Sequence, residues 1–391
     1  MKNVKSKDKE KSHVIRADRK TLVRIITAYN FGQKVDLTEI LCNEMMPVPL
    51  ALAELNGLLK SGDKAILQTR LLKNIDCPDS INLHGKSSCL IIDGQALVVS
   101  LGKANCDYFG ELADQFINSV MWQGNLCDRI DIVFDRYRDS SIKESTRKRR
   151  TKNQKAIRKS ATERGIRLPH NWINFLACHK NKTDYARFLS EQMKLKESYD
   201  KQMVTSGGFL NELEVWSLRD IDTRQLSSTQ EEADTRIILH AISCEQKCIV
   251  VSSRDTDVLV LLLSHFDRIN CKELWMKAGT AKKPKNIPVH DIVSSISQDI
   301  LKSLIPFHTL TGCDTTSFIA QHTKWTAWDI LKTHSHLIEN LGEDNFEESD
   351  YKKIEQFFCI LYGMPDEISI DKVRLKLFLK KKKPRCFAPY K

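Results

Sequence analysis

Short apolar runs alternate with amphipathic segments through the middle of the chain. The apolar runs are of strand length and predict buried β-strands at residues 88–93, 129–135, 247–253 and 272–277. Apolar positions at spacings of three and four predict helices at residues 111–122, 168–200, 228–241 and 292–305. Strands that alternate with helices predict an α/β fold with a central, mainly parallel sheet flanked by helices.

The same patterns predict an order of domains. Residues 1–20 are polar and predict a disordered basic tail, and residues 21–85 carry a helical pattern that predicts an N-terminal helical module. The α/β domain would occupy residues 86–320, with a basic insertion at 136–167. Residues 321–391 predict a helical C-terminal region with a basic tail, as if the sequence continued into a longer protein.

The longest apolar run, residues 258–263, is only as long as a strand, whereas a membrane span needs roughly 18 apolar residues. The N-terminal MKNVKSKDKEKSH lacks the apolar segment of a secretory signal. The twelve cysteines are scattered, and none has the spacing of a zinc site, which favours reduced thiols. Cys244 and Cys248 are interpreted as one helix face. We therefore expect an intracellular protein, nuclear or cytoplasmic, with no membrane partner.

Basic charge is concentrated in three segments. The net charge of the chain is +11, but residues 136–167 contain 13 Lys or Arg and 3 acids, for a net charge of +10. Residues 372–391 add +9 and residues 1–20 add +5, so the remainder of the chain carries −13. An acidic body with basic segments suits a polyanion that binds around a cation-filled site. The alternative is that each segment is a solvated helix face or tail.

Acidic residues recur where the predicted strands end. Asp93, Asp135, Asp255 and Asp257 each follow an apolar run. In a parallel sheet, ligands bind at the carboxyl ends of the strands, so these side chains would face one crevice. A helix start and a Gly-Cys-Asp turn offer further acids, Glu231, Glu232, Asp234 and Asp314.

So many carboxylates share a small volume only if they become protonated or bind cations. Oxygen ligands favour Mg²⁺ or Mn²⁺ over zinc, and two such ions roughly 4 Å apart would activate a water and stabilise the leaving oxygen of a phosphodiester. Each acid also has a simpler interpretation, as a turn residue or a helix cap. Glu231 fits a capping box with Ser228, and Asp131 alternates with apolar residues, which predicts a surface position.

Five sequence blocks stand in an order that resembles the flap endonuclease branch of the PIN-like nuclease superfamily. They are LIIDG, IVFD followed by the basic segment, EEAD, SRDTD and LTGCD, within about residues 88–320. The chain is still more similar to a group of uncharacterised animal proteins with EEADTRI, DTDVLVLL and LTGCDTTS blocks, for which a mobile-element origin is implied. After Asp314, the Gly-x-Gly hairpin with which flap endonucleases hold duplex DNA does not occur.

The resemblance implies a metal-dependent nuclease that acts on DNA rather more than on RNA. It assigns catalytic and metal-binding roles to seven acids, Asp93, Asp135, Glu232, Asp234, Asp255, Asp257 and Asp314. Asp234 stands where the family has Glu. Residues 136–167 would match the basic arch of that family, with Arg147, Lys148, Arg149 and Arg150 as candidates for gripping the nucleic acid.

Two other functions remain open. The chain could be an inactive PIN-like module that binds nucleic acid or protein without cleavage. Alternatively, the strand followed by Asp255-Thr-Asp257 resembles the nucleophile motif of haloacid-dehalogenase-like phosphatases. That family carries the motif first in the chain, whereas here it follows two other strands that end in Asp, which favours the nuclease.

The basic insertion generates a test. The Arg147→Ala, Arg150→Ala double variant should bind nucleic acid more weakly without a change of sequence preference. Each phosphate contact that is lost should lower the salt dependence of single-strand binding by a slope of about 0.7. The measurement is affinity against salt concentration for the variant and the wild type. Coincident lines would show that the segment is ordinary solvated surface.

Overall fold

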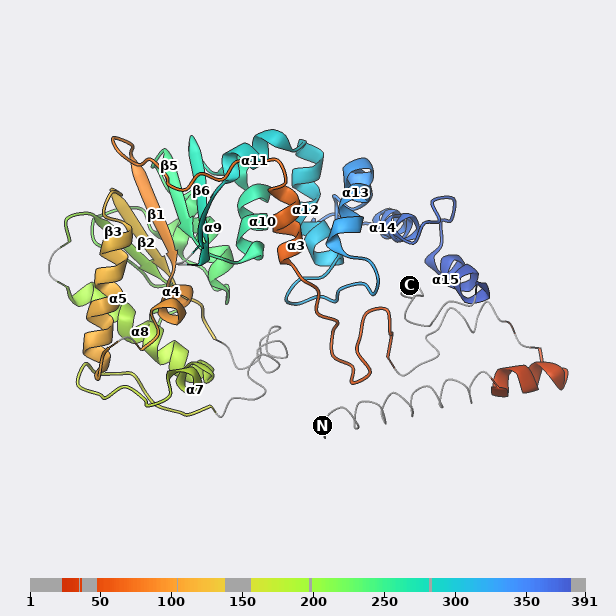
Figure 1. The fold of residues 1–391 in the computed structure, drawn as a ribbon, viewed down its shortest axis with the longest axis horizontal. Helices are drawn as coiled ribbons and strands as arrows, with labels where there is room; N and C mark the ends of the chain where they lie inside the picture. The colour runs from red at the N-terminus through yellow and green to blue at the C-terminus, as the bar shows by residue number, and fades with distance from the viewer. Residues whose placement is uncertain are drawn as a thin grey trace. The chain divides into compact units, whose positions relative to one another are not determined.

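The computed structural model describes residues 23–34, 36, 48–103, 105–137, 156–196, 199–280 and 283–380. The predicted tail at residues 1–20 and the candidates Arg147, Lys148, Arg149 and Arg150 lie outside these ranges. The chain forms two compact units, one made of residues 1–70 and 298–391 and the other of residues 71–297 (Figure 1). In the part of the chain that the structure describes, no helix has the length and apolar character needed to cross a membrane.

The unit of residues 71–297 is built on a seven-stranded sheet. Its strand order is β4-β3-β2-β1-β5-β6-β7. The five inner strands are parallel, and β4 and β7 pair antiparallel at the two edges. The strands are β1 (Ser88–Asp93), β2 (Arg129–Val133), β3 (Gln202–Ser206), β4 (Val215–Ser217), β5 (Cys248–Ser252), β6 (Glu273–Thr280) and β7 (Lys283–Pro288). The predicted α/β class with a mainly parallel sheet is confirmed.

Helices cover both faces of this sheet, in two layers. One layer contains α4 (Gly94–Leu101), α5 (Phe109–Gln123), α7 (Trp172–Leu176) and α8 (His179–Leu195). The other contains α9 (Ala233–Ile242), α10 (Thr256–Ser264) and α11 (Val289–Ser295). In Figure 1, α5 and α8 stand on one side of the sheet, and α10 and α11 stand on the other. Short 3-10 turns lie at Arg224–Leu226 and Phe266–Arg268.

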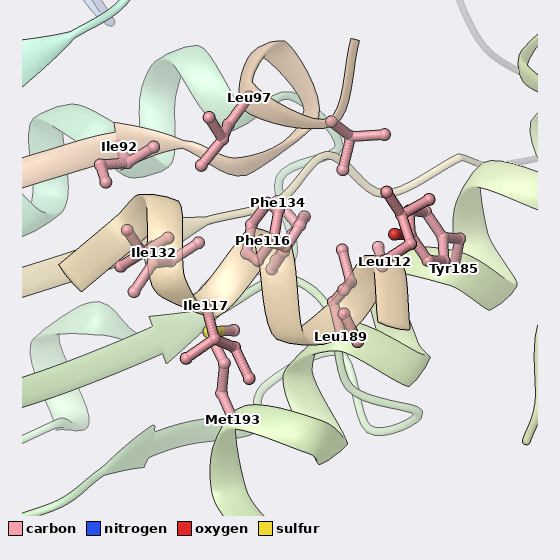
Figure 2. Packing of buried hydrophobic residues seen from close by; sticks show 14 of the residues in the cluster. Ile92, Leu97, Leu112, Phe116, Ile117, Ile132, Phe134, Tyr185, Leu189 and Met193 are labelled. Atoms are coloured by element: carbon pink, nitrogen blue, oxygen red, sulfur yellow. The ribbon is translucent and has the colours of Figure 1, made fainter. Parts of the chain in front are cut away.

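Alternate residues of the strands face the two layers, as strand geometry requires. Ile92 and Ile132 join the core beneath α5 and α8, where Phe116 stacks on Phe134 with ring centroids 6.0 Å apart (Figure 2). The intervening residues of β1 and β2 face α9, which packs against both strands. Strands β2 and β3 are buried along their whole length, so the polar residues that they carry face covered surfaces and not solvent.

The unit of residues 1–70 and 298–391 is helical. Its helices are α3 (Ala65–Leu71, whose last residue falls in the other unit), α12 (Gln298–Leu310), α13 (Lys324–His334), α14 (Glu348–Leu361) and α15 (Ile370–Leu379), with a 3-10 turn at Ser335–Leu337. Helices α12 to α15 pack in succession along the chain. Trp328 is buried against Phe307, with ring centroids 5.9 Å apart, whereas Trp325 is 40% exposed beneath the Arg70 guanidinium. The Trp328 ring is therefore part of the core of this unit.

The helical pattern predicted near the N-terminus is only partly correct. Residues 48–64 form turns, and Ala53 pairs with Leu59 in an isolated antiparallel bridge. Gly57 adopts a φ of +78°, and Pro49 lacks an amide hydrogen, so a continuous helix is disfavoured there. The leucines of residues 48–64, whose spacing resembles that of a helix, lie on these turns instead.

Two other predicted helices differ in detail, and three strands were not predicted. The segment predicted as one helix over 292–305 is divided by extended backbone at Ile296 into α11 and α12. The helix predicted from residue 228 begins at Ala233. The run at 258–263 belongs to α10, and residues 156–167 of the basic segment contain no helix. Strands β3, β4 and β7 have no counterpart among the predicted strands.

Glycines allow the segments around Phe134 to approach closely. Gly207 has a φ of +82°, and a Cβ there would lie 2.2 Å from the carbonyl oxygen of Phe134. A Cβ at Gly94 would lie 2.5 Å from the Phe134 ring. Both glycines therefore fix the backbone next to the residues that end β1 and β2.

This close approach generates a test. Gly207→Ala should lower the free energy of unfolding by about 3 kcal/mol, because left-handed strain adds to a backbone clash. Gly85→Ala is the matched control, since Gly85 has a φ of +68° with no atom within 4 Å of a built Cβ. The control should lose only about 1 kcal/mol in urea titrations. Equal losses would show that the contact with Phe134 does not matter.

Candidate metal centre

The carboxyl ends of β1, β2 and β5 meet at one edge of the sheet. Strand β1 is in register with both neighbours, so that Asp93 is opposite Val133 and Ile92 is opposite Ser252. The chain leaves β1 for the α4 layer and leaves β5 for the α10 layer. The chain therefore leaves two adjacent parallel strands toward opposite faces of the sheet, and α/β proteins bind ligands at the carboxyl ends of strands related in this way.

Asp93 ends β1 and caps helix α4. Its Oδ1 accepts a hydrogen bond from the Ala96 amide at 2.8 Å. Burial, the negative charge of Asp135 and, to a smaller extent, that of Asp255 together raise the pKa of Asp93 to about 7, against the lowering effect of the amide hydrogen bonds. The Asp93 carboxyl group is thus electrostatically linked to two other predicted acids.

Asp135 connects the end of β2 to the start of α9. Its Oδ1 accepts from the Ala233 amide at 2.7 Å, and its Oδ2 accepts from the Tyr137 hydroxyl at 3.2 Å. The Lys182 ammonium lies 5.2 Å from the centroid of the Tyr137 ring. Sequence reasoning missed Tyr137 and Lys182. Tyr137 is two residues from a predicted ligand, which is the one signal that could have indicated it.

Three carboxylates come closest together. Asp234, Asp255 and Asp257 each offer an oxygen within 4.8 Å of the others, and all three side chains are partly buried. Asp255 caps α10 by accepting from the Asp257 amide at 2.9 Å, and Asp234 lies in the first turn of α9. Two helix N-termini therefore place positive dipole ends beside these charges, which lowers the cost of their convergence.

Two other predicted acids are described by their own surroundings. Glu232 is the N-cap residue of α9, but its side chain makes no capping hydrogen bond. Asp314 belongs to the other unit, where its Oδ2 lies 3.3 Å from the Lys64 ammonium. Roles for Glu232 and Asp314 at the metal centre remain predictions.

Asp131 is not a surface residue as predicted. It is fully buried, and it accepts two hydrogen bonds of 2.7 Å from Arg129 and one of 2.6 Å from His240. Although burial opposes ionisation, His240 and then Arg129 hold the pKa of Asp131 below its usual value. The alternation in β2 was misleading because both faces of this strand are covered. His240 is a hydrogen-bonded core residue.

Two other sequence interpretations are corrected. Glu231 does not form a capping box with Ser228, because α9 starts after both residues and the Ser228 hydroxyl accepts from the Gln230 amide instead. Cys244 and Cys248 do not share a helix face, since Cys248 begins β5 and Cys244 follows α9. The ten cysteines of the described ranges are free thiols.

Part of the basic segment already has acidic partners. Arg158 pairs with Asp184 at 2.7 Å, and Arg164 pairs with Asp114 at 2.6 Å. Arg136 donates to backbone carbonyls, including that of Phe209 at 3.0 Å. These side chains brace the segment against α5, α8 and the loop after β3. The predicted candidates Arg147, Lys148, Arg149 and Arg150 lie outside the described residues, so their role stays a prediction.

The donor set fits a hard divalent cation. Every potential ligand is a carboxylate oxygen, the ligand type that Mg²⁺ and Mn²⁺ prefer. A raised carboxyl pKa next to other acids is the expected sign of a site whose charge is not yet compensated. The acidic cluster is therefore compatible with a metal-dependent nuclease.

Comparisons with known proteins give structural neighbours alone. No known protein family matches the chain, and no curated protein matches it. The chain is similar to the flap endonuclease of bacteriophage T5 in a pseudo-enzyme–product complex with DNA and metal ions, at 12% identity and a TM-score of 0.40 over 75% of this chain and 97% of that chain. The T5 protein co-crystallised with metal ions has the same identity and coverage, with a TM-score of 0.38. Scores this low support no assignment of function.

The raised pKa of Asp93 predicts how pH acts on the metal-free protein. The stabilisation that protonated Asp93 provides is complete below pH 4 and is lost as pH rises through about 7. Asp93→Asn keeps a capping oxygen and removes the charge, so its melting temperature should depend less on pH between 5 and 8. At pH 8 it should exceed that of the wild type by roughly 2–4 °C.

Thermal unfolding in the presence of a chelator provides the measurement. Asp220→Asn is the control, because Asp220 is exposed. The control should keep the pH dependence of the wild type. An Asp93→Asn curve parallel to the wild-type curve would contradict a strained charge at Asp93.

Proposed function

We propose that this protein is a divalent-metal-dependent nuclease that hydrolyses phosphodiester bonds by a two-metal mechanism. The observation that carries the proposal is the convergence of Asp234, Asp255 and Asp257, each with an oxygen within 4.8 Å of the others. Asp93 and Asp135 belong to the same acidic region, because the charges of Asp135 and Asp255 both raise the pKa of Asp93. Acids that served only as separate turn residues and helix caps would not need to lie close enough to interact electrostatically, as these five do.

The acids divide into roles by their positions. Asp234, Asp255 and Asp257 would hold one Mg²⁺ or Mn²⁺ ion, and Asp93 and Asp135 would contribute to a second, with Glu232 and Asp314 as further candidate ligands. Bound ions of this kind would lower the pKa of a water molecule and stabilise the leaving oxygen of a phosphodiester. The order of the sequence blocks and their resemblance to flap endonucleases support a metal-binding role for these acids as a set.

The protein's own side chains would orient the reacting groups. Asp135 is held by the Ala233 amide and the Tyr137 hydroxyl, so its free lone pairs have a fixed direction. Lys182, over the Tyr137 ring, adds a positive charge on the side of Asp135 that leads into the basic segment. Arg147, Lys148, Arg149 and Arg150 would neutralise the phosphates that flank the scissile bond.

The resemblance of the sequence blocks favours DNA over RNA as the substrate. The scattered cysteines suit a reducing compartment, so we propose an intracellular location, nuclear or cytoplasmic. The alternative of an inactive binding module predicts metal and nucleic-acid binding without cleavage. The phosphatase alternative predicts hydrolysis of a phosphomonoester that does not require the basic segment.

The most direct test of the activity is the Asp255→Asn variant. It should reduce Mg²⁺-dependent cleavage by about 100-fold or more, because a metal ligand loses its charge. Nucleic-acid binding should change by less than about threefold, since the basic segment is intact. Asn also keeps the capping oxygen of α10, so the fold should be preserved.

Cleavage is measured on labelled single-stranded, nicked and flapped DNA and on RNA, with Asp220→Asn as the control that retains activity. Equal cleavage by Asp255→Asn and wild type would refute the carboxylate assignment. Metal binding by a wild-type protein that cleaves none of the nucleic acids would favour the inactive module. Release of phosphate from a phosphomonoester would favour the phosphatase.

A further inference from the structure

A hydrogen-bonded group of buried polar side chains connects strands β2 and β3 to helix α9. His240 of α9 lies between Asp131 of β2 and Ser206 of β3. Its Nδ1 is 2.6 Å from Asp131 Oδ2, and its Nε2 is 2.8 Å from Ser206 Oγ. All three residues have 0% exposure. The mechanism proposed above uses none of them.

The Asp131 carboxylate determines which group donates the hydrogen bond at Nδ1 of His240. Arg129 binds both oxygens of Asp131, so this carboxylate is ionised and accepts hydrogen bonds. Nδ1 of His240 must therefore carry a hydrogen and donate it. The charges of Arg129 and Asp131 cancel in the core, and Nε2 of His240 shares a hydrogen bond with the Ser206 hydroxyl.

The connectivity from Ser206 through His240 to Asp131 is that of a hydrolase triad, but burial excludes this role. A nucleophilic hydroxyl must reach a substrate, and the side chains of Ser206 and His240 are fully enclosed. The network therefore acts on the protein itself. Its members come from β2, β3 and α9, so it can fix the position of the helix on the sheet.

Helix α9 is attached to β2 at two points. Near its start, the Ala233 amide donates to Asp135 Oδ1 at 2.7 Å, and two turns later His240 donates to Asp131. The two residues of α9, Ala233 and His240, are seven positions apart, about 10.5 Å along the helix axis. Their partners are four positions apart, with Asp131 in β2 and Asp135 two residues after the end of that strand. Two contacts at separate points along α9 prevent the helix from sliding along its axis and from rotating about it.

We propose that His240 is a positioning residue, whose hydrogen bonds to Asp131 and Ser206 hold α9 so that the Asp234 carboxylate meets those of Asp255 and Asp257. This inference rests on the proposed function of that carboxylate group. Asp234 is adjacent to the first attachment, and α9 packs against α10, which carries the other two acids. A slip of one residue would move Asp234 by about 1.5 Å, which the coordination distances of roughly 2.1 Å for Mg²⁺ do not tolerate.

The test compares Mn²⁺ affinity among variants, each measured where circular dichroism shows it to be folded. His240→Ala should weaken Mn²⁺ binding by about tenfold or more, as loss of a residue that orients ligands does. His240→Asn retains a donor near the Nδ1 position and should recover part of this affinity. Leu189→Ala is the control, because Leu189 is fully buried in the α8 layer on the opposite face. The control should bind Mn²⁺ like the wild type despite its lower stability.

A second measurement does not need metal. Amide hydrogen exchange at Ala233, relative to Val120 in α5, should accelerate about tenfold in His240→Ala and remain unchanged in Leu189→Ala. If His240→Ala does not fold, Ser206→Ala provides the same comparison, because it removes the Nε2 contact alone. Wild-type affinity together with wild-type exchange at Ala233 would overturn the inference. A wild-type protein that binds no Mn²⁺ would refute the proposed function, and the exchange data would still decide the role of His240.

Discussion

Carboxylates that repel one another are held together at one edge of a parallel sheet, and the packing of the rest of this unit keeps them there. The sheet topology brings the ends of β1, β2 and β5 together, and each is followed by an acid. The effect is visible in Asp93, whose pKa is raised to about 7 by burial and by Asp135 and Asp255. A protein keeps such an arrangement when something outside the chain compensates the charge, and all-oxygen donors of this kind suit a hard divalent cation.

Much of the surrounding structure holds these charges in place. Helices α4 and α10 begin at Asp93 and Asp255, so amide hydrogens and helix dipoles partly neutralise both carboxylates. Asp135 accepts from the first residue of α9, and the buried contact between His240 and Asp131 fixes that helix further along. The positions of the acids therefore depend on the packing of helices against the sheet, and not on the loops alone.

The sequence predicted the strands that end in acids because an apolar run that stops at a carboxylate is a local signal. Strand β3 escaped prediction because only two of its five residues, Met203 and Val204, are apolar. Its polar residues are buried and satisfied by partners distant in sequence, as when Ser206 meets His240. Asp131 was misread for the same reason. The spacing of polar residues indicates which faces of a strand or helix are polar. It does not indicate whether a polar side chain is buried with a hydrogen-bonding partner from a distant part of the sequence.

The most direct measurement of the central claim is a crystal structure of the protein grown with Mn²⁺, with anomalous scattering to locate the ions. The account predicts a strong anomalous peak coordinated by Asp234, Asp255 and Asp257, and a second peak on the side of Asp93 and Asp135. Diffraction from crystals containing excess Mn²⁺ that shows no ion at these carboxylates would contradict it.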